Sequence, residues 1–177
     1  MAKWIIDSDH SVAGFAIRYL MTANIRGIFS RITGTVNFDP PDLPALSVEA
    51  RIEIATVSTG VRKRDEHLLS ADFFDAAKFP DMTFRSTRAE PLGENRFRLH
   101  GDAAIHGITR PLTLEGEYAG PVKLPEFIGG ETSIGFVCRG LVNREDFGIT
   151  WGSTPMEGGL VAAKEIQITL DIEADMS

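Results

Sequence analysis

The chain of 177 residues contains a single cysteine, Cys138, so no disulfide can form within it. It has no CxxC motif and no cluster of cysteine and histidine at the spacing of a structural zinc site. We therefore expect neither a disulfide framework nor a metal centre to organise the fold, and no cofactor is implied.

Long apolar runs are also missing. The longest, such as residues 12–17, fall far short of the roughly 20 residues that cross a bilayer. The first residues, MAKWIIDSDHS, lack the apolar segment of roughly 7–15 residues found in secretory signals. We expect no transmembrane segment, and a cytoplasmic location for the chain as given or a periplasmic one if a leader has been removed.

Positive charge is in deficit, with 18 basic against 25 acidic residues and a net charge of −7. Binding to DNA or RNA through phosphates needs clustered lysine and arginine, so nucleic acid is not an expected partner. The hydrophobic fraction of 43% is that of an ordinary folded protein. The length suits one domain over residues 1–177 with one core.

The clearest pattern that is present is the alternation of apolar and polar residues, which is typical of a β-strand with one buried face. In segment 165–173, four apolar residues from Ile166 to Ile172 alternate with polar ones. The same period predicts strands at residues 4–6, 32–38, 46–56, 97–105, 112–118 and 134–142.

Turn signals at residues 39–42, 93–95 and 106–111 separate these segments and predict successive antiparallel hairpins. About eight strands with one apolar face each must pack as two sheets or close on themselves, and closure removes exposed edges. Long strands favour closure. We therefore predict an all-β fold, an extended eight-stranded antiparallel β-barrel with one or two short helices.

Residues 61–74 break the alternation. They are charged, contain no glycine or proline, and place Leu68, Leu69 and Phe73 at helical spacing, which predicts a short helix. Residues 18–23 are a weaker candidate for a further helical turn. The segment 120–130, rich in glycine and proline, is expected to be a surface connection, with a mobile lid as the alternative.

Histidines are the first candidates for acid–base chemistry or metal binding. The chain has four, His10, His67, His100 and His106, and no two stand at a short metal-ligand spacing. Ser11 beside His10 and Ser70 near His67 invite a hydrolase interpretation, but no GxSxG motif is present. The sequence therefore predicts no catalytic residue.

Two charged clusters leave alternatives open. Residues 62–67 form either a solvated helix face with internal ion pairs or a polar mouth that meets a ligand head group, since arginine pairs bidentately with phosphate. In segment 143–148, pairing of a buried Arg144 with Asp146 is expected to fix a loop that turns at Gly148.

Phenylalanine is abundant, with eleven residues against two tyrosines. Core packing explains this content, but an eight-stranded barrel is also just wide enough to hold one slim ligand. Four small residues lie on or near predicted inward faces, which favours a lumen that the wall does not fill. They are Ala50, Gly101, Ala103 and Gly116.

Six motifs that run in order along the chain resemble those of the YceI-like proteins. They are W-x-x-D-x-x-H-S from Trp4, S-T-G-x-x-x-R-D-x-H-L from Ser58, S-x-D-F-F-D from Ser70, F-P at Phe79, I-H-G-I-T from Ile105 and N-R-x-D-F-G-I-x-W from Asn143. Each motif alone is weak, but their order and spacing cover almost the whole chain and make the combination specific.

The resemblance implies a lipocalin-like barrel, often a homodimer in a bacterial cell, that carries a polyisoprenoid or other long-chain amphiphile. It implies structural roles for the motif residues, with Arg64, Asp65 and His67 in one knot and Arg144 with Asp146 in another. The expected ligand-binding residues are Phe15, Ile17, Phe38, Val48, Ile52, Phe84, Phe97, Leu99, Leu114, Phe136, Ile168 and Leu170. The expected polar-mouth residues are Arg64, His67 and Arg144.

Two other function classes remain open at this point. An enzyme acting on an isoprenoid or fatty-acid-like lipid would use His10, His67 or His106 and would place a perturbed histidine in a cleft. A structural, stress-related protein would have a solid barrel and would bind no lipid. The state of the lumen separates these classes from a carrier.

Overall fold

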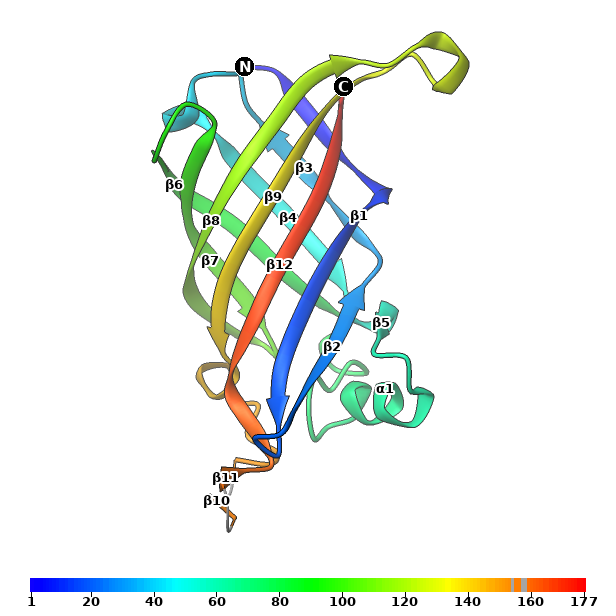
Figure 1. Ribbon diagram of the computed structural model, residues 1–177, viewed down its shortest axis with the longest axis vertical. Helices are drawn as coiled ribbons and strands as arrows, with labels where there is room; N and C mark the ends of the chain where they lie inside the picture. Colours follow the sequence, from blue (N-terminus) through cyan, green and yellow to red (C-terminus); the bar gives the residue numbers. More distant parts are fainter. Residues whose placement is uncertain (154, 157–158) are drawn as a thin grey trace.

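The computed structural model describes residues 1–153, 155–156 and 159–177. Eight antiparallel strands follow one another in the order β12-β9-β8-β7-β6-β4-β3-β1, and β1 pairs with β12 to close the barrel (Figure 1). These strands are β1 (Lys3–Tyr19), β3 (Ile32–Asn37), β4 (Ser47–Glu53), β6 (Asp81–Pro91), β7 (Arg96–Ile105), β8 (Ile108–Lys123), β9 (Thr132–Asn143) and β12 (Ala162–Met176). The predicted eight-stranded antiparallel barrel is confirmed.

The remaining elements lie around this barrel. They are the strands β2 (Ala23–Phe29), β5 (Val57–Ser58), β10 (Pro155–Met156) and β11 (Gly159–Leu160), the helix α1 (Arg62–Leu69), and the 3-10 turns η1 (Leu43–Ala45), η2 (Ile54–Thr56), η3 (Glu126–Ile128) and η4 (Arg144–Phe147). In Figure 1, α1 and β2 lie toward the end of the barrel away from both chain termini. Across the described residues, the single α-helix is too short and polar to cross a bilayer.

The structure corrects several predicted boundaries. Residues 18–23 are not helical, because β1 continues to Tyr19 and a tight turn leads into β2 with Leu20 and Met21 at positive φ. The helix stops at Leu69, where the amide of Ser70 bonds to the carbonyl of His67, so the rest of segment 61–74 forms turns. Strands β2 and β6 escaped prediction. In β6 a register shift between Ser86 and Arg88 interrupts the alternation.

The connection at residues 120–130 lies at the surface as expected, and part of it has regular secondary structure. Strand β8 continues through it to Lys123, and the turn η3 follows before β9 begins. This hairpin extends beyond the barrel at the end that carries the termini (Figure 1). Its tip residue Phe127 is 86% exposed, so the tip packs against none of the barrel core.

A bulge in β1 changes which residues face inward. Before the bulge, Trp4 and Ile6 are buried, whereas after it the buried positions are Ser11 and Ala13. Five steps along β1, from Asp7 to Val12, match two steps along β12. Because side chains alternate with period two, the three extra residues exchange the inner and outer faces of the strand. Strand β1 therefore points apolar side chains into the barrel both before and after the bulge.

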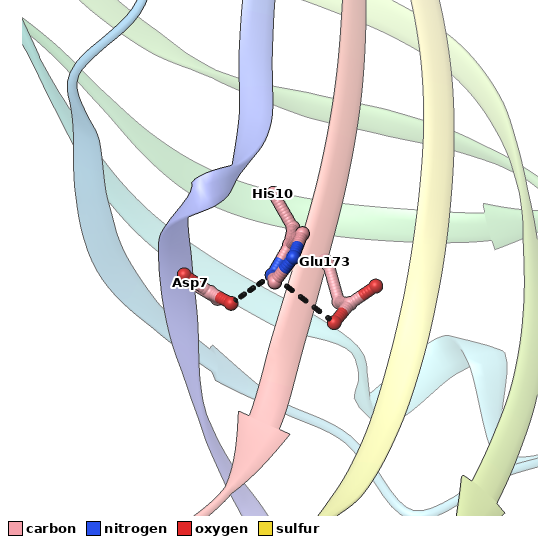
Figure 2. Close-up of side chains that lie close together, drawn as sticks. All are labelled: Asp7, His10 and Glu173. Atoms are coloured by element: carbon pink, nitrogen blue, oxygen red, sulfur yellow. Dashed lines mark hydrogen bonds and ion pairs between the residues drawn. The ribbon is translucent and has the colours of Figure 1, made fainter. Parts of the chain in front are cut away.

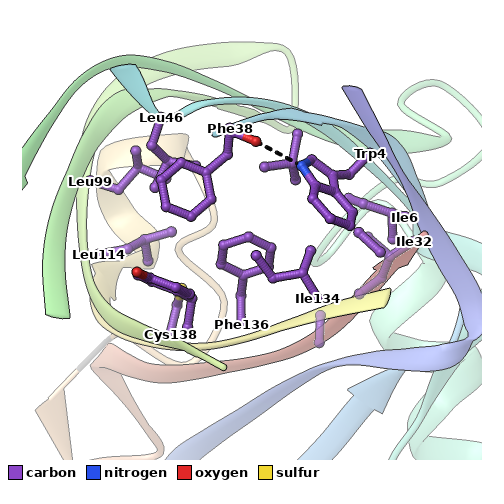
Figure 3. Packing of buried hydrophobic residues seen from close by; sticks show 14 of the residues in the cluster. Trp4, Ile6, Ile32, Phe38, Leu46, Leu99, Leu114, Ile134, Phe136 and Cys138 are labelled. Atoms are coloured by element: carbon purple, nitrogen blue, oxygen red, sulfur yellow. Dashed lines mark hydrogen bonds between the residues drawn. The ribbon is translucent and has the colours of Figure 1, made fainter. Parts of the chain in front are cut away.

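The end of the barrel near the termini is filled by large side chains (Figure 3). The indole Nε1 of Trp4 donates a hydrogen bond of 2.9 Å to the carbonyl oxygen of Phe38. The ring of Phe38 packs edge-on against Tyr118, with centroids 5.0 Å apart, and is tilted against Phe136. We call the cluster Trp4, Phe38, Tyr118, Ile134 and Phe136 the aromatic plug. It closes this end of the lumen.

Candidate functional site

Beyond the aromatic plug, the barrel encloses a cavity of about 1010 Å³. Its walls are almost entirely aliphatic and aromatic side chains from all eight barrel strands, joined by residues of β2 and α1. Inward-facing residues here, such as Val48 and Ile52 of β4, are only half-buried, although they point into the barrel. Open space lies in front of them, so the lumen is hollow over this part of its length.

The structure brings nearly all of the predicted ligand-binding residues together on this wall. Those that line the cavity are Phe15, Ile17, Val48, Ile52, Phe84, Phe97, Leu99, Leu114, Phe136, Ile168 and Leu170. Phe38 does not line it, since its ring is fully buried in the aromatic plug. The alternation predicted that Phe38 faces inward but not that the barrel is already full at its level.

The small inward residues have two different roles. Ala50 and Ala103 line the cavity, so their short side chains do widen it. At Gly101, however, a Cβ atom would collide with the ring of Phe84, and at Gly116 it would collide with Phe97 and the Cys138 sulfur. These two glycines admit neighbouring rings and leave no empty space, contrary to the interpretation made from the sequence.

Helix α1 lies beside the cavity and presents one face to it. Lys63, Arg64, His67 and Leu68 all line the cavity, and their positions three and four apart place them on one side of the helix. Residues of the β1–β2 hairpin and Trp151, after η4, complete the rim. Because several of these rim residues are exposed, the cavity opens to solvent here.

Thr59 holds helix α1 in place through hydrogen bonds with two charged side chains of the helix, Arg64 and Asp65. Its amide and hydroxyl donate hydrogen bonds of 2.8 and 2.6 Å to one carboxylate oxygen of Asp65. Arg64 donates to the Thr59 hydroxyl from Nε at 2.7 Å and to the Thr59 carbonyl from Nη2 at 2.8 Å. Arg64 and Asp65 thus form a knot as expected, but Thr59 and not His67 is its centre.

His67 is held separately at the rim. Its Nε2 lies 2.8 Å from a carboxylate oxygen of Asp72, and its ring packs edge-on against Phe73 and Trp151. The hydroxyl of Ser70 donates to the backbone carbonyl of His67, at 2.6 Å, and not to the imidazole. The Ser70 hydroxyl is therefore not placed for His67 to remove its proton, and the pair does not form an activated serine nucleophile.

Arg144 is the most deeply buried charged residue on the cavity wall, at 2% exposure. Its five N–H groups donate to four backbone carbonyls and one hydroxyl, those of Ala163, Ile149, Trp151, Ala162 and Ser153, over 2.7–3.2 Å. Burial lowers its pKa from the usual arginine value. The predicted pairing with Asp146 is wrong, because that carboxylate is exposed and backbone oxygens occupy the guanidinium.

The other histidines lie outside the cavity lining. His106 has positive φ in the β7–β8 turn, where its Nδ1 lies 3.0 Å from the Phe147 carbonyl and its ring packs on Phe79. His100 lies on the outer face, 3.1 Å from the Thr113 hydroxyl. Both have structural contacts and neither faces the lumen.

His10 lies on the outer surface at the β1 bulge, next to two carboxylates (Figure 2). Its Nδ1 is 2.5 Å from Asp7 and 3.8 Å from Glu173. The hydrogen bond with Asp7 raises the pKa of His10 and lowers that of Asp7. Ser11 exchanges hydrogen bonds with the backbone of Glu173 at the same place. A sequence scan could not find this cluster, because Glu173 is distant in the chain; its contacts hold the bulge to β12.

Cys138 lies on the cavity wall, and burial raises its thiol pKa to about 12. The thiol is therefore protonated near neutral pH and behaves as an apolar wall group.

All charged side chains among the described residues that line the cavity are basic: Arg26, Lys63, Arg64 and Arg144. No aspartate or glutamate of the described residues lines it, although the chain as a whole is acidic. Arg64, His67 and Arg144 were predicted at a polar mouth, Lys63 belongs to the segment 62–67 that was considered for that role, and the prediction missed Arg26. Helical spacing separates Lys63, which stands four residues before His67, from the rest of that segment.

Comparison with protein families finds a match to the YceI-like domain over residues 4–174. A UPF0312 protein of Staphylococcus aureus is 30% identical over 177 residues, covering 100% of this chain and 99% of the relative. A UPF0312 protein of Vibrio cholerae is 32% identical over 150 residues, 84% of this chain and 78% of the relative.

Solved structures share the architecture. The YCEI protein of Campylobacter jejuni superposes with a TM-score of 0.76 at 29% identity, covering 90% of each chain. BcnA of Burkholderia cenocepacia gives 0.82 at 22% identity, over 95% of this chain and 98% of that one. A polyisoprenoid binding domain from Saccharophagus degradans gives 0.73 at 12% identity over 100% of both chains. The last two likenesses concern the fold alone.

Proposed function

Since the chain belongs to the YceI-like family, we propose that it is a carrier for a long-chain amphiphile, with polyisoprenoids as the expected class, and that it performs no chemistry on its cargo. The observation that carries this proposal is the cavity of about 1010 Å³ with an apolar wall. A polyisoprenoid binding domain of the same fold in Saccharophagus degradans supports the choice of ligand class.

The cavity suits a tail better than a compact ligand. Its lining extends from Phe136 of the aromatic plug and Phe97, which packs against it, to α1 and Trp151 at the rim. Each CH₂ group buried along this wall would contribute about 0.8 kcal/mol, so a long chain binds tightly with few polar contacts. The protein would then read the length and width of the tail, and the aromatic plug would set the limit on length.

The absence of chemistry is part of the same proposal. Of the histidines considered for catalysis, only His67 lines the cavity, and its Nε2 is engaged by Asp72. The only thiol is kept protonated by burial. Neither group has the nucleophile–base geometry that covalent catalysis requires. The homodimer, the transport role and the cellular location remain predictions, to be checked by light scattering and by fractionation of the producing cells.

The direct test is extraction of protein purified without added lipid, followed by mass spectrometry. We expect a long-chain amphiphile in stoichiometric amount. Delipidated protein should also bind prenyl alcohols with affinity that rises with chain length, measured by displacement of a fluorescent fatty-acid probe. Recovery of no lipid together with no binding of farnesol or geranylgeraniol would contradict the proposal.

A matched pair of variants localises the binding. Ala50 lines the cavity, whereas Ala104 is partly buried and does not. Replacing Ala50 by Trp places an indole in the lumen, and the same replacement at Ala104 does not. Only the first should abolish lipid recovery; equal recovery from both would show that the lipid binds elsewhere.

A further inference from the structure

We infer that the cavity selects amphiphiles with an anionic head group, a carboxylate or a phosphate monoester, over neutral ones with the same tail. The inference rests on the proposed function and goes beyond it by naming the head-group chemistry. It comes from Lys63 and Arg64, which line the cavity from α1.

Helix α1 carries basic residues on the side that lines the cavity and an ion pair on its exposed side. The acidic residues are engaged elsewhere, since Asp65 accepts from Thr59 and Glu66 pairs with Arg62 at 2.9 Å on the exposed side. Within the described part of the chain, Lys63 has no carboxylate within 4.0 Å, and neither does Arg64. The helix therefore presents uncompensated positive charge to the lumen and neutralised charge to solvent.

Hydrogen bonds to Thr59 fix the orientation of the Arg64 side chain but do not neutralise its charge. Thr59 takes two of the five guanidinium N–H groups, and both of its acceptor oxygens are uncharged. The remaining N–H groups stay on a side chain whose orientation is already fixed. A preorganised guanidinium forms short, charge-assisted hydrogen bonds with carboxylate or phosphate oxygens. An anionic head would also compensate a half-buried charge that borders an apolar cavity.

Arg144 provides the internal contrast. It is more buried than Arg64, yet all five of its N–H groups already have partners, so it has none left for a ligand. Arg26 adds a further basic residue to the lining from β2. The head-group site is therefore assigned to the α1 side of the rim and not to the wall near η4.

The test compares ligands that differ only at the head. Delipidated protein is titrated with farnesyl monophosphate and farnesol, and separately with palmitate and hexadecanol, below their micelle concentrations. We expect each anion to bind roughly tenfold more tightly than its alcohol, with the difference shrinking as salt is raised. The two pairs show whether phosphate or carboxylate is preferred.

Substitutions assign the effect to the helix. Lys63→Gln combined with Arg64→Gln should reduce the difference to less than about twofold, because it weakens the binding of the anions more than that of the alcohols. Arg62→Gln removes the same charge from a side chain that is 92% exposed and outside the lining, so it should keep the difference. If folding of the double variant is impaired, Lys63→Gln alone should still reduce the difference.

The outcomes separate the two claims. Alcohols and anions that bind equally would overturn the head-group inference while the carrier function stands. A difference that persists in the α1 variants, or is lost equally in Arg62→Gln, would also overturn it. A protein that binds neither member of either pair would overturn the carrier proposal and the inference together.

Discussion

The two ends of the barrel are built from the same strands and the same kind of inward-facing residues, yet one is solid and the other hollow. At the end near the termini, Phe38 and Tyr118 pack ring against ring and Trp4 is 1% exposed. At the other end, Val48 and Ile52 face inward but remain half-buried around a cavity. Period-two alternation therefore reports which side chains point inward and not whether they meet.

At the closed end the rings of Phe38 and Tyr118 pack against each other, whereas aromatic residues of the open end, such as Phe15 and Phe84, border the cavity. The bulge in β1 contributes to the division, since it changes the inward residues of that strand from Trp4 and Ile6 to Ala13 and Phe15. The closed end thus supports the stability of the fold, and the open end is free to hold a ligand.

The largest effect is expected from a matched pair of truncations. Phe38→Ala in the aromatic plug should lower the free energy of unfolding by about 3–5 kcal/mol, because it leaves a cavity in a close-packed region. Phe15→Ala on the cavity wall should cost less than about half as much, since the Phe15 ring already borders open space. Urea denaturation of both variants measures the difference. Equal losses would show that the two ends are packed alike.

At the open end, hydrogen bonds from Arg144 stabilise the structure, whereas side-chain packing does so in the aromatic plug. Arg144→Ala should destabilise the protein by about 2–4 kcal/mol, because four buried or partly buried carbonyls lose their donors. Arg139→Ala, which removes an exposed arginine of β9, should change stability by less than about 0.5 kcal/mol. Thermal unfolding followed by circular dichroism compares them, and equal melting temperatures would contradict the structural role of Arg144.

Filling the hollow end should affect binding more than stability. Ala50→Trp should weaken the binding of geranylgeraniol at least tenfold, because the indole occupies space that several methylene groups of the ligand would fill. Overpacking should be small, since the new ring enters open space. Isothermal titration measures the binding and urea denaturation the stability. A strong loss of stability without loss of affinity would mean that the cavity is not available at this level.

The smallest effect is expected on the outer face, where the Asp7–His10 contact holds the bulge between the two ends. The raised His10 pKa means that its contribution is fully present below about pH 6.5 and is lost as pH rises through the folded-state value. The lowered Asp7 pKa means that its contribution is present above about pH 3.8 and is lost as pH falls through the folded-state value.

NMR titration of the His10 imidazole checks this contact. Asp7→Asn should return its pKa toward 6.5 and remove the corresponding pH dependence of unfolding. Asp9→Asn is a control on the same bulge and should lower the His10 pKa less, because Asp9 acts on the imidazole through its charge and makes no hydrogen bond to it within the described contacts. An unchanged His10 pKa in Asp7→Asn would disprove the assigned cause.

Alternation and turn signals predicted the barrel, because they depend on local period-two patterning, and eleven of the twelve residues expected to bind the ligand line the cavity. The bulge could not be predicted, since Ser11 is fixed by the backbone of Glu173, 162 residues away. Phe38 was wrongly assigned to the cavity wall. Its side chain points inward as predicted, but it lies at the level of the aromatic plug along the barrel axis, outside the cavity. Arg144 was misassigned because its partners are backbone oxygens, which no sequence pattern displays.

Cys138 gives the protein a built-in chemical reporter. It is the only thiol in the chain, and it lies on the cavity wall with a pKa of about 12. Any alkylation of a thiol in the protein must therefore take place inside the barrel, at a rate limited by entry and by the small thiolate fraction. A bound tail would shield the sulfur, so the alkylation rate of the unmodified protein measures occupancy without a fluorescent label or an engineered residue.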